Sequence, residues 1–174
     1  MCNAAGLGGS KDFPDLSPDE TGTMIRLNFE SAVALSYRFI PILKKNAPSY
    51  ILNVSSMAGF APFPIKSIYS ATKAALISFS YSLKNILRAE QISVSCLCPG
   101  PVFTKAAIEE ETVRKLGAFG RHMAVDPAKV GEQAVRKMLG GKLIIIPGKL
   151  AGISSFLLRI LPRRLTARIL YRSR

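Results

Sequence analysis

Short apolar runs alternate with longer amphipathic segments along the middle of this chain. Residues 49–55 and 92–97 are rich in apolar and β-branched side chains and predict two buried strands. Between them, residues 69–88 alternate apolar and polar positions with the period of a helix. Residues 142–147 predict a last strand. This order of strands and helices favours an α/β fold with a parallel sheet.

Two further helices have clear starting signals. Residues 17–20 combine a serine cap, a proline at the first helical position and a glutamate three residues after the cap. The helix or helix pair that begins there is expected to reach residue 45, with a kink near Pro41. An aspartate followed by proline predicts another helix over residues 126–139.

The last part of the sequence is apolar and then basic. Residues 150–161 are strongly apolar, and Pro162 precedes a segment that predicts a short basic helix. Two interpretations stay open for this tail, a packed cover and an anchor on a membrane surface. No apolar run reaches the roughly 18 residues of a spanning helix. We treat residues 1–148 as the body of one domain and 149–174 as its tail.

The charge balance narrows the possible partners. The 174-residue chain carries 24 basic and 11 acidic side chains, a net charge of +13. Such a balance suits nucleic acid, anionic lipid or a phosphorylated cofactor. No zinc-ligand spacing or aromatic-rich motif supports nucleic acid, so that partner is not expected. Six of the basic residues crowd the last sixteen positions: Arg159, Arg163, Arg164, Arg168, Arg172 and Arg174.

Cysteine and histidine usage argues against a metal site. The three cysteines form no disulfide pattern, and the single histidine, His122, is distant from them in sequence. Cys96 and Cys98 lie at a predicted strand and should be buried small apolar residues in a reducing compartment. We therefore expect no metal and a cytoplasmic protein, which could also lie peripherally on a membrane.

Three residues in the middle of the chain suggest redox chemistry at a carbonyl group. Tyr69 and Lys73 are four positions apart, so a helix places both side chains on one face. An ammonium beside a phenol favours the phenolate and lowers the phenol's pKa from its ordinary value near 10. Ser56 ends a strand thirteen residues before the tyrosine, and its hydroxyl could hold the same substrate oxygen. The set suits interconversion of a carbonyl and an alcohol.

Three motifs in this order resemble the short-chain dehydrogenase/reductase family. They are Asn53-Val54-Ser55-Ser56 on a strand, Tyr69-Ser70-Ala71-Thr72-Lys73 at the start of a helix, and Pro99-Gly100-Pro101-Val102-Phe103-Thr104 after another strand. The resemblance implies an NAD(P)-dependent oxidoreductase with a small-molecule carbonyl or alcohol substrate, one that could be hydrophobic or lipid-like. It implies catalytic roles for Ser56, Tyr69, Lys73 and Asn28, in which Asn28 holds a water near the lysine.

The resemblance also implies a cofactor site and an assembly. The residues expected at NAD or NADP, with NADP slightly favoured, are Asn3, Tyr69, Lys73, Pro99, Gly100, Val102 and Thr104. The segment that follows, to about Gly120, would be a mobile substrate lid. Family members often dimerise through the helix after Tyr69 and the helix with Asn28, so a homo-oligomer is expected.

The family's glycine-rich phosphate loop has no counterpart in this sequence. Gly6-Leu7-Gly8-Gly9 fails the required Gly-x-Gly-x-x-Gly spacing, and Pro14 prevents a long helix directly after it. We interpret it as an ordinary glycine turn. The expected fold is therefore a partial Rossmann-like three-layer α/β/α unit without the first βαβαβ unit. Weak cofactor binding follows, and the alternative function is a catalytically silent fragment that acts as a dimerising or membrane-surface module.

Overall fold

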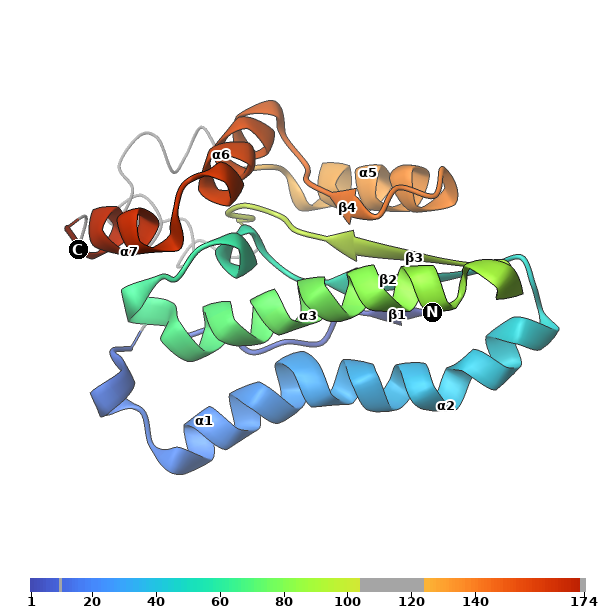
Figure 1. Ribbon diagram of the computed structural model, residues 1–174, viewed down its shortest axis with the longest axis horizontal. Helices are drawn as coiled ribbons and strands as arrows, with labels where there is room; N and C mark the ends of the chain where they lie inside the picture. The colour runs from blue at the N-terminus through green and yellow to red at the C-terminus, as the bar shows by residue number, and fades with distance from the viewer. Residues whose placement is uncertain (10, 104–123, 173–174) are drawn as a thin grey trace.

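The computed structural model describes residues 1–9, 11–103 and 124–172, which form a parallel sheet flanked by helices (Figure 1). The strands lie side by side in the order β1 (Cys2–Asn3), β2 (Ser49–Val54), β3 (Ile92–Leu97) and β4 (Ile144–Ile145). Every neighbouring pair is parallel. The predicted α/β fold with a parallel sheet is confirmed, and the two predicted central strands pair with each other. The last strand is shorter than the predicted 142–147.

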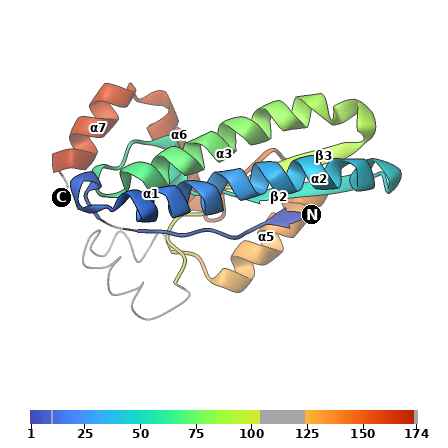
Figure 2. The ribbon, with the colours of Figure 1, turned by 90° about the horizontal axis from the view of Figure 1, so that it is seen from below.

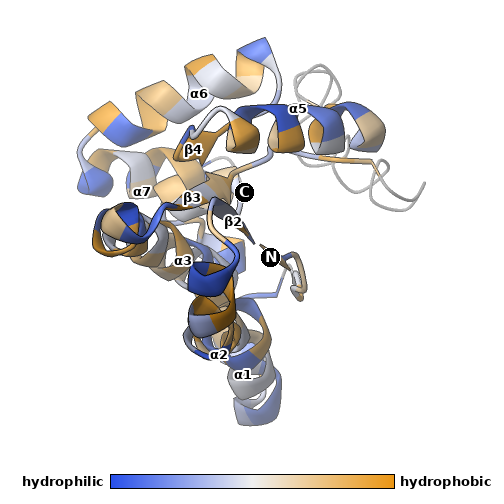
Figure 3. Cartoon of the chain, turned by 90° about the vertical axis from the view of Figure 1, so that its right-hand side faces the viewer, coloured by the Kyte–Doolittle hydropathy of each residue, from blue (hydrophilic) through white to orange (hydrophobic). Residues whose placement is uncertain are grey.

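Helices cover both faces of this sheet. α2 (Ser31–Lys45) and α3 (Ser67–Ile86) lie on one face, and α5 (Pro127–Leu139) lies on the other (Figures 1 and 2). Alternation along β2 explains the division, because neighbouring residues of a strand point to opposite faces. Ile51 packs in a buried cluster with Leu83 and Leu87 of the α3 side, whereas Leu52 packs with Val130 and Ala134 of α5. β3 and β4 are correspondingly apolar (Figure 3). The three-layer prediction is confirmed.

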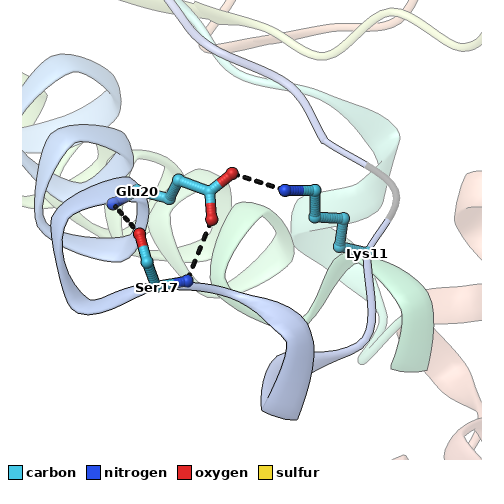
Figure 4. Close-up of polar contacts among 3 residues, drawn as sticks. All are labelled: Lys11, Ser17 and Glu20. Atoms are coloured by element: carbon cyan, nitrogen blue, oxygen red, sulfur yellow. Dashed lines mark hydrogen bonds and ion pairs between the residues drawn. The ribbon is translucent and has the colours of Figure 1, made fainter.

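α1 (Pro18–Ile25) begins with the cap that the sequence predicts. The Ser17 Oγ accepts a hydrogen bond from the Glu20 backbone N–H at 3.1 Å, and Glu20 Oε2 accepts one from the Ser17 N–H at 2.9 Å. Lys11 Nζ lies 2.6 Å from the other carboxylate oxygen of Glu20 (Figure 4). This reciprocal arrangement satisfies two backbone donors that a helix start leaves open.

The first long helical region contains an irregularity that the sequence did not predict. A π-helical turn over Arg26–Glu30 separates α1 from α2, whereas Pro41 lies inside α2. The Ser31 N–H accordingly bonds to the carbonyl of Arg26, five residues back. The helical region is thus interrupted around Asn28, the only residue of the turn that is buried, and the kink near Pro41 stays a prediction.

The tail forms two helices, α6 (Lys149–Ile160) and α7 (Arg163–Arg172), at the end of the molecule where α3 begins (Figures 1 and 2). Part of it is a packed cover, as one interpretation of the sequence predicts. Ala151 is buried in a cluster with Met57, and Leu158 packs against the same cluster. Within the described ranges, no helix has the length and apolar character needed to cross a membrane.

Candidate active site

β2 carries Ser56 to the edge of the sheet at which its parallel strands end. Ser56 follows the strand directly and caps a 3-10 turn over Met57–Phe60. Its Oγ accepts a hydrogen bond from the Ala58 backbone N–H at 3.1 Å. This contact fixes the position of the oxygen and leaves its hydroxyl proton available for donation.

α3 places Tyr69 and Lys73 beside one another in its first two turns. The Lys73 Nζ lies 5.7 Å from the centroid of the Tyr69 ring. Lys73 is only 4% exposed, and its ammonium donates to the Val54 carbonyl at 2.9 Å. The lysine therefore spans from α3 to the end of β2 and is held under the loop that bears Ser56.

Close contact between α3 and the loop after β2 fixes this arrangement. The Ser55 hydroxyl donates to the Lys73 carbonyl at 2.8 Å. A Cβ on Gly59 would lie 2.8 Å from the Lys73 carbonyl carbon and 2.7 Å from Ile77 Cδ1, so no side chain fits there without movement. Ser55 and Gly59 thus set the distance between the serine loop and the helix.

Burial and hydrogen bonding act in opposite directions on Tyr69. Burial raises the pKa of the phenol, and a hydrogen bond with Ser56 lowers it by a smaller amount, so the pKa lies above its ordinary value. Burial also lowers the pKa of Lys73, while the nearby thiols Cys96 and Cys98 oppose that shift. The expected net lowering of the Tyr69 pKa is therefore corrected, because desolvation outweighs the effect of the partners.

Asn28 lies next to this group and uses its side chain to hold a loop. Its Oδ1 accepts from the Leu7 N–H at 2.7 Å, and its Nδ2 donates to the Leu7 carbonyl at 2.9 Å and to Thr72 Oγ1 at 3.2 Å. The Thr72 hydroxyl in turn donates to the Tyr69 carbonyl at 2.8 Å. Both amide hydrogens of Asn28 are used in these contacts. The Asn28 side chain therefore has no hydrogen left to donate to a water near Lys73, and such a water would have to be bound by other atoms.

The loop held by Asn28 approaches the lysine closely. A Cβ on Gly6 would lie 3.2 Å from Lys73 Nζ and 3.3 Å from Asn28 Oδ1. Glycine at this position therefore lets the main chain lie against the buried ammonium. The turn that the sequence presents as an ordinary glycine turn forms one wall of the site.

The other predicted cofactor residues lie in several places. Asn3 donates through Nδ2 to Asn53 Oδ1 at 2.8 Å, and Asn53 donates to Ser80 at 2.9 Å, so its amide takes part in a buried polar chain between strands and helix. The Pro99 carbonyl accepts from the Met57 N–H at 3.0 Å. Val102 packs against the apolar cluster under α5. Gly100 lies between Pro99 and Val102 in sequence and is partly exposed. Thr104 and the expected lid lie outside the described residues.

Sequence reasoning assigned no supporting contact to four residues near the catalytic group: Ser55, Gly59, Thr72 and Gly6. Each acts through a contact between segments distant in the chain, as with Thr72 and Asn28, which are 44 positions apart. Local pattern gives no signal for such contacts. A glycine in the short loop between a strand and a helix is the one local sign that could have pointed to Gly59.

Comparison with known proteins supports the arrangement of these elements. The family model described as short chain dehydrogenase matches residues 1–115. An uncharacterized oxidoreductase of Bacillus subtilis strain 168, YvrD, is 34% identical over 105 residues, which are 60% of this chain and 40% of YvrD. Dehydrogenase/reductase SDR family member 4 of Bos taurus is 28% identical over 151 residues, 87% of this chain and 48% of that protein. The chain thus spans less than half of these relatives' length.

Solved structures share the fold. A structure from work on 7beta-hydroxysteroid dehydrogenase stereoselectivity superposes with a TM-score of 0.85 at 19% identity, over 98% of this chain and 66% of the other. A short chain dehydrogenase of Burkholderia cenocepacia J2315 in complex with NADP gives a TM-score of 0.78 at 22% identity, over 97% and 67% of the two chains. Together with the family match over most of its length, these likenesses show that the chain belongs to the short-chain dehydrogenase/reductase family.

Proposed function

We propose that this protein is an NAD(P)-dependent oxidoreductase that interconverts a carbonyl and an alcohol at Ser56, Tyr69 and Lys73. The observation that carries the proposal is the convergence of these three side chains where β2 ends and α3 begins. Ser56 is near enough to lower the pKa of Tyr69, and Lys73 is buried beside the tyrosine ring. Family membership makes a redox reaction the chemistry that this group serves best.

Tyr69 acts as the proton donor in the direction of carbonyl reduction. Because burial raises its pKa above the ordinary value near 10, the phenol keeps its proton at neutral pH. The Ser56 hydroxyl donates a hydrogen bond to the substrate oxygen and aligns it with the phenol. The nicotinamide ring, when bound, supplies the hydride in reduction and receives it in oxidation. In the reverse direction Tyr69 accepts the proton of the alcohol.

Lys73 and Asn28 position the proton-transferring group. The Lys73 ammonium is held by the Val54 carbonyl and retains further N–H donors for a ligand. Asn28 fixes the glycine-containing loop beside that ammonium through its two bonds to Leu7. The water-holding role expected of Asn28 stays a proposal, and it would need an atom other than the amide hydrogens.

The residues present fit one end of a dinucleotide. Gly6 allows the main chain to lie against Lys73 without a side chain between them, which leaves a cradle that a Cβ would fill. Lys73 and Tyr69 would hold the ribose at the nicotinamide end, and Pro99, Gly100, Val102 and Thr104 would lie near the ring. In the described residues, no glycine-rich loop leads into a helix where a pyrophosphate could bind. Weak binding by these 174 residues is therefore part of the proposal.

NADP is the favoured form of the cofactor. The net charge of +13 suits the additional phosphate of NADP better than it suits NAD. A substrate that is hydrophobic or lipid-like is favoured by the apolar tail beside the serine loop, where Leu158 packs against the cluster of Met57 and Ala151. The protein would work in the cytoplasm.

A homo-oligomer is the assembly that we expect. α2 and α3 expose large apolar side chains, among them Tyr37 at 82% and Ile86 at 69%. A second copy could cover these surfaces. Sedimentation at several concentrations, with Tyr37→Ser and Ile86→Ser as variants, tests this. A monomer at every concentration would contradict it.

The alternative function is a catalytically silent module that associates with itself or with a membrane surface. The exposed apolar residues of the tail favour peripheral membrane contact through residues 150–174. Enzyme and module are separated by one experiment, calorimetric titration with NADPH and NADH followed by assay of carbonyl reduction. The oxidoreductase proposal expects NADPH-dependent reduction that Tyr69→Phe removes. Absence of reduction at saturating NADPH would favour the silent module.

A further inference from the structure

The two tail helices expose large apolar side chains that do not pack against the rest of the domain. α6 turns Ala151 and Ser155 inward, each 1% exposed, and α7 turns Thr166 inward at 2%. These small residues attach the helices to the domain. The larger apolar side chains point elsewhere and remain exposed: Ile153, Phe156, Leu157, Ile160, Leu165 and Ile169. We call these six residues the tail face.

The tail face is much more apolar than a solvated helix surface needs to be. Phe156 is 60% exposed and Ile160 is 63% exposed. Each lies three or four positions from another exposed apolar residue of α6, so these side chains share one side of the helix. Contiguous exposed apolar side chains usually mark a contact surface. The tail face therefore has the properties of one side of an interface.

The charges within the tail itself are of one sign. Glu132 is the last acidic residue of the sequence, and ten lysines and arginines follow it. Arg163, Arg164 and Arg168 are exposed on α7, and among the described residues none of them forms an ion pair with a carboxylate. Their positive field is therefore available to an external anion.

An anionic bilayer is the occupant that this combination fits best. A bilayer surface presents phosphate and carboxylate headgroups directly above an apolar phase, so arginines and apolar side chains can be satisfied together. A second copy of this chain would bring two sets of unpaired arginines together, which like-charge repulsion disfavours. The length and composition of α6 and α7 suit helices that lie on the surface.

The attachment of the tail places the candidate active site near that surface. The cluster of Ala151 and Leu158 includes Met57, the residue directly after Ser56. Arg159 lies over the Phe60 ring, with its guanidinium carbon 5.6 Å from the ring centroid. α7 contacts the turn Pro64–Lys66, which leads into α3 and Tyr69. Tail and site therefore share the same end of the molecule (Figure 1).

From these contacts we infer that the tail face docks on anionic lipid and turns the Ser56–Tyr69 end of the molecule toward the bilayer. The inference deepens the proposed function, because it makes the lipid phase the source from which a hydrophobic substrate would reach the site. The docking and its orientation do not depend on catalysis. They can therefore be tested even where no turnover is seen.

Vesicle binding tests the docking. We expect the protein to co-sediment with phosphatidylcholine vesicles that contain phosphatidylserine, and to bind vesicles of phosphatidylcholine alone much more weakly. Each basic side chain near an anionic surface contributes about a fivefold change in partitioning. Replacing Arg163, Arg164 and Arg168 by glutamine should therefore lower binding by roughly 100-fold. Phe156→Ser with Ile160→Ser should lower it by roughly 100-fold as well, because two apolar side chains no longer enter the bilayer.

Matched variants test whether vesicle binding depends on where the basic and apolar side chains lie, and not only on how many the protein carries. Arg38, Lys45 and Arg88 are also exposed, and replacing all three by glutamine removes the same charge away from the tail. Val135→Ser with Leu139→Ser removes apolar side chains of similar exposure from α5. Both controls should keep vesicle binding within about threefold of the unchanged protein.

A lipid-borne fluorescence quencher tests the orientation. In a Cys2→Ser background, single labels are placed at Pro62→Cys, in the loop after Ser56, and at Asn85→Cys, on α3. Asn85 lies sixteen positions after Tyr69, or about 24 Å further along the helix axis. Stronger quenching at position 62 supports the inference. Equal or stronger quenching at position 85, vesicle binding that the tail variants leave unchanged, or a tail variant that changes self-association instead of vesicle binding would overturn it.

Discussion

Asn28 holds both main-chain polar groups of Leu7, accepting from its N–H at 2.7 Å and donating to its carbonyl at 2.9 Å. This clamp joins the π-helical turn between α1 and α2 to the loop after β1. Since Gly6 in that loop lies against Lys73 Nζ, the clamp also sets one wall around the buried ammonium. The site thus depends on contacts among three segments that are distant in sequence.

Replacing Asn28 by alanine should destabilise the fold as well as the site. The change removes three hydrogen bonds of a side chain that is 1% exposed, and each such bond contributes about 0.5–1.5 kcal/mol. We expect the free energy of unfolding to fall by about 3 kcal/mol in urea denaturation. Asn85→Ala, at an exposed position of α3, is the control and should change it by less than about 0.5 kcal/mol. Similar stability of the two variants would show that the clamp is not needed.

Gly59 should tolerate no side chain, in contrast to a glycine on α5. A Cβ at Gly59 would meet Lys73 main-chain atoms and Ile77, so Gly59→Ala should cost about 1–3 kcal/mol by overpacking. Nothing lies within 4 Å of a Cβ at Gly131, so Gly131→Ala should stabilise the helix by about 0.5–1 kcal/mol. Thermal unfolding of both variants measures the difference. A Gly59→Ala protein as stable as the unchanged chain would contradict the close contact of loop and helix.

The pH dependence of alcohol oxidation should report the interaction of Ser56 with Tyr69. Oxidation needs the phenolate, so its rate should rise with pH toward the raised pKa of Tyr69. Ser56 lowers that pKa, and Ser56→Ala should therefore move the rising limb to still higher pH. The rate itself should fall by about 100-fold or more, because a donor to the substrate oxygen is lost. Ser82→Ala, exposed on α3, is the control. An unmoved or downward-shifted limb in Ser56→Ala would count against the assignment.

Local sequence signals predicted the elements of this fold well. The start of α1 at residues 17–20, the two central strands and the α5 cap at Asp126 all depend on neighbouring residues, and all are confirmed. The spacing of Tyr69 and Lys73 likewise predicted their proximity. These features need no knowledge of what packs against them.

Tertiary contacts account for what the sequence did not predict. The interruption around Asn28 forms where its side chain can hold Leu7, and Pro41 is accommodated inside α2. The raised pKa of Tyr69 follows from burial, which depends on how other segments cover the ring. The tail is a packed cover on its inner face, and the anchor on a membrane surface stays a prediction for its exposed outer face.

Transfer of deuterium to a ketone from NADPH that carries deuterium at both C4 positions tests the central claim most directly. We expect the deuterium to appear on the carbinol carbon of the alcohol product, as mass spectrometry would show, at NADPH concentrations near about 1 mM because binding is weak. Tyr69→Phe should lower this transfer by about 10²–10⁴-fold with an unchanged circular dichroism spectrum. Transfer that continues at the original rate in Tyr69→Phe would contradict the account.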